Sequence, residues 1–110
     1  MDSVVWQRKK GYSFVAKKDT FSINDVIIGT TKVIEIDISS STFKLGVAFI
    51  SEYLEDTMIL KILLNNQIVF NKSLRYSYET KYGKMYSTNS MIDTDLLYKD
   101  GVNILDFIVN

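Results

Sequence analysis

Short segments with alternating apolar residues run through most of this chain, and they constrain its fold more than any other feature. Residues 33–38 read VIEIDI, with an isoleucine at every second position. In residues 43–50, FKLGVAFI, large apolar residues alternate with a set dominated by Lys44, Gly46 and Ala48. A period of two is typical of a half-buried β-strand. The small residues also indicate that another strand or a ligand packs closely against the second face, and the serines at 39–41 predict a turn.

The second half of the chain continues this pattern. Residues 58–64 (MILKILL) predict a strand, Asn65-Asn66 a tight turn, and residues 68–70 the strand that returns. No amphipathic helical stretch exceeds about ten residues, so we expect at most one or two short helical turns, near 51–56 or 94–98. The fold class predicted is therefore all-β: a single antiparallel β-sandwich of about eight short strands.

Length and composition indicate one domain. A chain of 110 residues with 46% hydrophobic and 13% aromatic residues has enough apolar material for a single core. We expect residues 1–110 to form this one domain, with residues 1–11 as a frayed N-terminal arm. Thirteen basic residues balance thirteen acidic ones, and this zero net charge argues against nucleic acid as the partner.

The residue types that are missing argue against an enzyme. The chain has no His and no Cys, so it lacks the commonest general base and any thiolate nucleophile or metal ligand. It contains no G-x-S-x-G sequence and no glycine-rich phosphate loop. We therefore predict a non-catalytic protein without a cofactor.

Two groups of acidic residues could supply the oxygen ligands of a metal site. Glu52, Glu55 and Asp56 form one group, and Asp93 with Asp95 the other. Neither has the D-x-D-x-D-G spacing of a calcium loop, although a structural calcium ion remains an alternative. We expect no metal, and we expect Asp93 and Asp95 to cap the turn at Leu96-Leu97 by accepting backbone N–H bonds.

The closing sequence MIDTDLLYKDGVNILDFIVN carries a resemblance to a known fold. Its pattern matches at nine positions: Ile92, Asp93, Leu96, Leu97, Gly101, Asn103, Leu105, Phe107 and Val109. Together with the preceding hairpin it resembles the end of galactose-binding-like jelly rolls, the fold of many carbohydrate-binding modules. The resemblance extends over about half the chain and implies a jelly-roll sandwich with the Leu pair plugging one end. It concerns the fold and leaves the function open. We expect Gly101 to be turn, and we expect six large apolar residues of this segment to be core: Ile92, Leu96, Leu97, Leu105, Phe107 and Val109.

The least regular segment, residues 71–90, holds the candidate binding site. Tyrosines offer flat apolar faces with a polar tip, which suits sugars and protein surfaces alike. The alternative is that these tyrosines pack against the sandwich edge. We predict a loop or strand region that binds a glycan or a protein through Tyr76, Tyr78, Tyr82 and Tyr86, with Arg75 and Lys84 as polar partners.

A second aromatic and basic group lies near the start of the chain: Trp6, Arg8, Lys9, Lys10 and Tyr12. It is either a docking arm for an acidic partner or for nucleic acid, or a frayed terminus whose Trp joins the core. No apolar run follows these charges as a secretory signal requires, and the run at 58–64 is too short to span a bilayer. Localisation stays open.

An alternative function belongs to a different class. A Met-initiated chain of this size without Cys is also typical of a small virus- or mobile-element-encoded protein. Such a protein would act by protein–protein interaction, as a virion or tail component or as an inhibitor of a host defence protein. A defined oligomer would favour this alternative.

Overall fold

The computed structural model describes residues 5–9, 11–17, 21–23, 26–29, 31–39, 41–51, 59–73 and 75–109. These residues are all-β, with one turn of 3-10 helix at Thr94–Leu96 (η1) and no longer helix. The eleven strands exceed the eight expected. They are β1 (Val5–Lys9), β2 (Tyr12–Ala16), β3 (Phe21–Ile23), β4 (Val26–Gly29), β5 (Thr31–Ile38), β6 (Thr42–Ser51), β7 (Ile59–Leu64), β8 (Gln67–Ser73), β9 (Tyr76–Thr80), β10 (Gly83–Asp93) and β11 (Val102–Val109).

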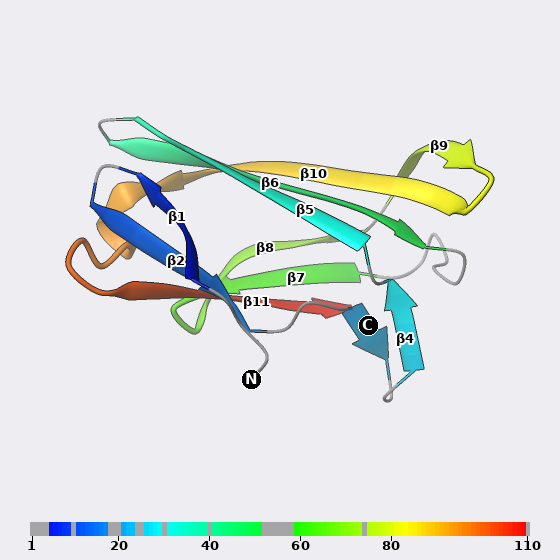
Figure 1. Ribbon diagram of the computed structural model, residues 1–110, viewed down its shortest axis with the longest axis horizontal. Coiled ribbons are helices and arrows are strands. Elements are labelled where there is room, and N and C mark those ends of the chain that lie inside the picture. The colour runs from blue at the N-terminus through cyan, green and yellow to red at the C-terminus, as the bar shows by residue number, and fades with distance from the viewer. Residues whose placement is uncertain are drawn as a thin grey trace.

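The strands form two main sheets that face each other, so the arrangement is sandwich-like (Figure 1). The lower sheet in Figure 1 has the order β1-β2-β11-β7-β8, and the upper sheet has the order β5-β6-β10-β9. A separate pair, β3-β4, lies at one end, where β3 approaches β11 and β4 approaches β6.

The core lies between the two sheets and is built by the alternation seen in the sequence. The inner residues of β6 are at most 1% exposed: Phe43, Leu45, Val47 and Phe49. The rings of Phe14 on β2 and Phe43 lie 6.3 Å apart, centroid to centroid, and join the two sheets. In the closing segment Ile92, Leu97, Leu105, Phe107 and Val109 are buried as predicted, and Leu96 is half-buried against them. Each such side chain stabilises the fold by about 1.5–3 kcal/mol when fully buried.

One pairing differs from the expected antiparallel arrangement. Strands β2 and β11 run parallel, with Val102 opposite Ser13 and Leu105 opposite Ala16. β11 also pairs antiparallel with β7, so the lower sheet is mixed. Alternating side chains specify which face of a strand is buried, but they carry no information on the direction of its neighbour.

Two segments are more regular than predicted. Residues 71–90, for which a loop or strand region is predicted, are mostly strand, because β8 extends to Ser73 and most of the rest belongs to β9 and β10. Residues 5–9 of the predicted N-terminal arm form β1 and pair with β2. In both segments, hydrogen bonds between the backbones of neighbouring strands stabilise the extended conformation. The weak apolar alternation of these segments did not predict that pairing. The predicted turn at Asn65-Asn66 is confirmed, with φ of 51° and 68°.

The end of the sandwich that contains η1 is held by a buried asparagine. Asn103 on β11 is 0% exposed and uses both ends of its amide. Its Nδ2 donates to the backbone oxygens of Ser13 (3.1 Å) and Tyr98 (3.0 Å). Its Oδ1 accepts from the Tyr98 N–H (2.7 Å) and from Asn65 Nδ2 (3.0 Å). One side chain thereby ties together β2, the β7–β8 turn and the loop before β11.

The turn at η1 is not capped as expected. Asp93 occupies the N-cap position but makes no side-chain capping hydrogen bond. Instead, the Thr94 N–H and hydroxyl both donate to the Ser41 carbonyl, at 3.0 and 3.1 Å. The Ser41 carbonyl, in the turn between β5 and β6, therefore accepts the backbone N–H bond that we expected an Asp93 or Asp95 carboxylate to accept.

Candidate functional site

The predicted site residues lie on and beside a hairpin at one end of the upper sheet (Figure 1). We call residues 76–86 the tyrosine hairpin: β9, the turn at Lys81-Tyr82 and the first part of β10. The Thr80 hydroxyl donates to the Gly83 carbonyl at 2.8 Å and accepts from the Tyr82 N–H at 3.1 Å. Gly83 has φ of 132°, a conformation that other residues rarely adopt. These features fix the turn and leave Tyr82 at its tip.

A β-bulge decides where the first two tyrosines point. Tyr76 pairs with Tyr86, but Tyr78 pairs with Met85, so β9 carries one extra residue at Ser77. Neighbouring residues 85 and 86 face opposite sides of β10. Tyr76 therefore shares the inner face with Tyr86, and Tyr78 lies on the outer face with Met85. Simple alternation along β9 would place Tyr76 and Tyr78 on the same face, and the bulge prevents this.

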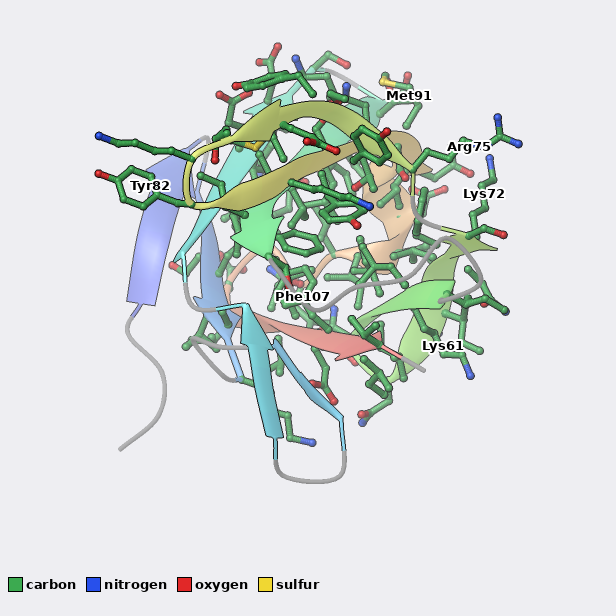
Figure 2. The ribbon with its side chains drawn as sticks, turned by 90° about the vertical axis from the view of Figure 1, so that its right-hand side faces the viewer. Lys61, Lys72, Arg75, Tyr82, Met91 and Phe107 are labelled. Atoms are coloured by element: carbon green, nitrogen blue, oxygen red, sulfur yellow. The ribbon has the colours of Figure 1, made fainter. Side chains whose placement is uncertain are left out.

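Three of the four tyrosines are exposed, and two carry a lysine over the ring. Tyr76, Tyr78 and Tyr82 are 42%, 56% and 64% exposed. Lys84 Nζ lies 4.7 Å from the ring centroid of Tyr76, and Lys81 Nζ lies 5.0 Å from that of Tyr82. Both distances allow cation–π attraction. The Tyr82 side chain projects freely from the tip in Figure 2.

Tyr86 does not belong to the surface site. It is 0% exposed and stacks on Phe49 across the β6–β10 pair, with ring centroids 5.4 Å apart and an angle of 19° between the planes. A ligand at the surface cannot reach this ring. The packing interpretation therefore applies to Tyr86, and the candidate site reduces to Tyr76, Tyr78, Tyr82, Arg75 and Lys84.

The charge around the tyrosine hairpin is mainly positive. Arg75 precedes β9 and is exposed, and Lys81 and Lys84 lie within the hairpin. Glu79 is the acidic residue of this segment. Cations beside exposed aromatic rings bind carboxylates by charge-assisted hydrogen bonds while the rings supply apolar contact area. Lys81 is not among the residues predicted for the site, and it joins them here because its Nζ lies over the Tyr82 ring.

A shallow hollow of about 200 Å³ lies on the outer face of the upper sheet. Its floor is formed by Gly46 and Ala48, the small residues noted in the sequence, and Glu35, Ser87 and Asn89 surround them. A Cβ atom on Gly46 would lie 2.9 Å from Asn89 Oδ1. The group that packs closely against this glycine is therefore the amide side chain of a neighbouring strand.

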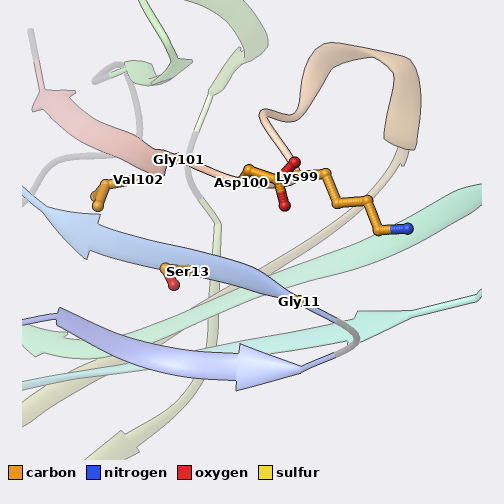
Figure 3. Close-up of a pocket in the computed structure, with 6 residues that line it drawn as sticks. All are labelled: Gly11, Ser13, Lys99, Asp100, Gly101 and Val102. Atoms are coloured by element: carbon orange, nitrogen blue, oxygen red, sulfur yellow. The ribbon is translucent and has the colours of Figure 1, made fainter.

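A second hollow, of about 340 Å³, lies between the β1–β2 turn and the loop before β11 (Figure 3). Ser13, Lys99 and Asp100 contribute its polar side chains. In Figure 3 the Lys99 side chain extends away from Ser13, so the charged and hydroxyl groups do not converge on one point. This hollow has no arrangement that favours a particular ligand.

Among the described residues, the remaining predicted groups add no site. Within the described ranges, no three acidic residues gather as a metal site would require, and Glu52, Glu55 and Asp56 lie outside those ranges. Of the N-terminal aromatic and basic group, Tyr12 is half-buried against the core. The backbone of residues 6, 8 and 9 belongs to β1, and Lys10 lies outside the described residues. In the described part of the chain, no helix combines the length and apolar character needed to cross a bilayer.

Comparison of the chain with protein-family models, with curated proteins and with solved structures finds no match.

Proposed function

We propose that this chain is a non-catalytic binding module that recognises an acidic protein surface through the tyrosine hairpin. The observation that carries the proposal is the pair of lysine–tyrosine contacts on an exposed hairpin, Lys84 with Tyr76 and Lys81 with Tyr82. Tyrosine and arginine are enriched at protein interaction hot spots, and the exposed Arg75 precedes the hairpin. The lysines add charge complementary to an acidic partner. A rigid hairpin also lowers the entropy lost when they are immobilised on binding.

The orientation of the rings favours a protein over a sugar chain. A sugar platform requires rings that present free faces on the same side. Here the bulge at Ser77 directs Tyr76 and Tyr78 to opposite faces, and lysines lie over Tyr76 and Tyr82. Because its exposed rings lie on both faces, the tyrosine hairpin fits a protein partner that contacts it from both sides.

A glycan is the second candidate ligand, and the outer-face hollow favours it. Glu35, Ser87 and Asn89 offer acceptors and donors around a floor of small residues. Ser77, next to Tyr78, contacts Ser87 at this face, with 3.3 Å between the two hydroxyl oxygens. Tyr78 would then stack on a sugar whose hydroxyls bond to the polar side chains.

We also propose that the connectivity is that of a jelly roll. The connections β6–β7, β8–β9 and β10–β11 each pass from one main sheet to the other, and β11 lies between β2 and β7. This agrees with the resemblance of the closing segment to galactose-binding-like domains. A structure determined by crystallography or NMR that placed β11 at an edge of the sheet would contradict the assignment.

The functional test compares three forms of the protein as bait: wild type, Tyr78→Ala/Tyr82→Ala, and Tyr98→Ala. Tyr98 is a matched control because it is 59% exposed and lies outside the hairpin. We expect partners captured by the wild type to bind the double variant at least about tenfold more weakly and the control equally well. The captured partner should be acidic, and its affinity should fall with salt.

A glycan array run with the same three proteins separates the two ligands. Sugar binding that is lost in the double variant would favour the glycan. Equal binding of every captured partner or sugar by the wild type and the double variant would refute a role for the hairpin. All three proteins must melt within a few degrees of one another, since exposed positions contribute little to stability.

A further inference from the structure

The upper sheet has a long free edge beside the tyrosine hairpin. β10 has eleven residues, but β9 pairs only with Gly83–Tyr86. Along the remaining seven residues, 87–93, β6 pairs with one side of β10, and no strand among those described pairs with the other. Alternate residues of a strand direct their N–H and C=O groups to the same side. About three residues of this edge therefore present unpaired backbone donors and acceptors.

A groove runs below this edge, between β10 and β8. It has a volume of about 460 Å³, and Asn89, Ser90 and Met91 form its β10 side. Met91 is 67% exposed. β8 is the last strand of the lower sheet. The groove is thus the open flank of the sandwich, where two sheet edges lie opposite each other.

Apolar side chains and one positive charge line the β8 side of the groove. Val69 and Phe70 of β8 line it and pack against the core. Lys72 also lines it, with Nζ 5.8 Å from the ring centroid of Phe70. Arg75 follows shortly after β8, and Figure 2 shows the Lys72 and Arg75 side chains projecting from the same side of the molecule. Lys72 is the charged residue among those that line the groove.

We propose that this flank binds an extended, acidic peptide segment of a partner, which adds a strand to the free edge of β10. Its backbone would pair with residues 87–93 in line with β9. Side chains on one face of the added strand would fill the groove above Val69 and Phe70, and those on the other face would lie beside Met91. An acidic side chain of the peptide would pair with Lys72. Backbone bonds supply affinity in this mode, and alternate side chains supply specificity.

The length of the peptide site is set by β9, which occupies the edge of β10 up to Tyr86 and leaves residues 87–93 free. Seven residues of edge span about 23 Å at about 3.3 Å per residue. At one end the chain passes from β8 to β9 between Ser73 and Tyr76, and β9 occupies the edge beyond. The site accepts a segment of about seven residues and excludes Pro from its centre, because Pro lacks the N–H that pairing needs. It uses a surface other than the exposed rings of the hairpin.

The test uses a phage-displayed library of random linear nine-residue peptides, selected on the wild-type protein. The best peptide is synthesised and its Kd is measured by fluorescence anisotropy against three proteins. These are wild type, Lys72→Glu in the groove, and Lys99→Glu on the loop before β11. Both lysines are exposed and both changes reverse one charge, so Lys99→Glu controls for net charge. Hydrogen exchange with and without the peptide then locates the protected amides.

We expect selected peptides with apolar residues at alternate positions, at least one Asp or Glu, and no central Pro. Lys72→Glu should weaken binding by about tenfold and Lys99→Glu by less than about twofold. Replacing the acidic residue of the peptide by Lys should restore binding to Lys72→Glu. Hydrogen exchange should slow within residues 87–93.

Three results would overturn the assignment. The first is that no peptide is enriched, or that the best one binds Lys72→Glu as tightly as wild type. The second is protection confined to the tyrosine hairpin. The third is a dimer in light scattering whose residues 87–93 become protected as protein concentration rises without peptide, which would assign the edge to a second copy of the chain.

Discussion

The Asn103 network should be the most sensitive polar position in the molecule. Replacing Asn103 by Leu keeps a similar side-chain volume and removes four hydrogen bonds, those with Ser13, Asn65 and both backbone groups of Tyr98. Each bond stabilises the fold by about 1 kcal/mol. Tyr98 is exposed and can regain water, but Ser13 is only 5% exposed. We therefore expect a loss of about 3 kcal/mol in the free energy of unfolding.

Urea denaturation followed by circular dichroism measures this loss, and for a domain of this size it corresponds to a fall in Tm of about 15 °C. Asn71→Leu is the matched control, because Asn71 is exposed on β8 and should change the free energy by less than about 0.5 kcal/mol. Hydrogen exchange adds a local readout. In Asn103→Leu the amides of Tyr98 and Ile104 should exchange faster relative to those of β6.

A loss below about 1 kcal/mol for Asn103→Leu would refute this reasoning. It would mean that the loop before β11 and the β7–β8 turn are held in place without the asparagine. Equal losses for Asn103→Leu and Asn71→Leu would lead to the same conclusion, since burial and bonding would then not distinguish the two positions.

Two further changes test the packing of β10. Thr88 Oγ1 is buried without a hydrogen-bond partner among the described residues, so Thr88→Val should raise the unfolding free energy by about 1 kcal/mol; a decrease in urea denaturation would show that the hydroxyl is bonded. Tyr86→Ala removes a fully buried ring and should cost about 4 kcal/mol, whereas Tyr78→Ala should cost less than about 0.5 kcal/mol. Equal costs in thermal melts would contradict the division of the tyrosines into core and surface.

Local patterns in the sequence predicted the strands whose inner faces are strongly apolar. β6 is the clearest case, since Phe43, Leu45, Val47 and Phe49 recur at every second position and are all buried. The Asn65-Asn66 turn was also predictable because asparagine tolerates positive φ. These features depend on the residues of one strand or one turn.

The strand pairing within the tyrosine hairpin could not be predicted from the sequence, for a physical reason. The inner positions of β10 include Thr88 and Ser90 as well as Tyr86 and Ile92, so the apolar alternation that marks β6 is absent there. The bulge at Ser77 also places Tyr76 and Tyr78 on opposite faces of the sheet. A bulge adds one unpaired residue to a strand, and the alternation of apolar residues in the sequence does not reveal it. For this reason the sequence placed Tyr86 in the site with the three tyrosines that are exposed.

The position of β11 has a consequence for how the chain folds during synthesis. Of the described strands, β11 is synthesised last, yet it separates β2 from β7 in the middle of the lower sheet. The hairpins β1–β2 and β7–β8 can form on the ribosome, but they cannot join until residues 102–109 have emerged. All four strands of the upper sheet are synthesised before β11. The apolar inner face of the upper sheet therefore stays uncovered until the lower sheet is complete. Folding is therefore a late and largely simultaneous event, and slowing translation should not help it.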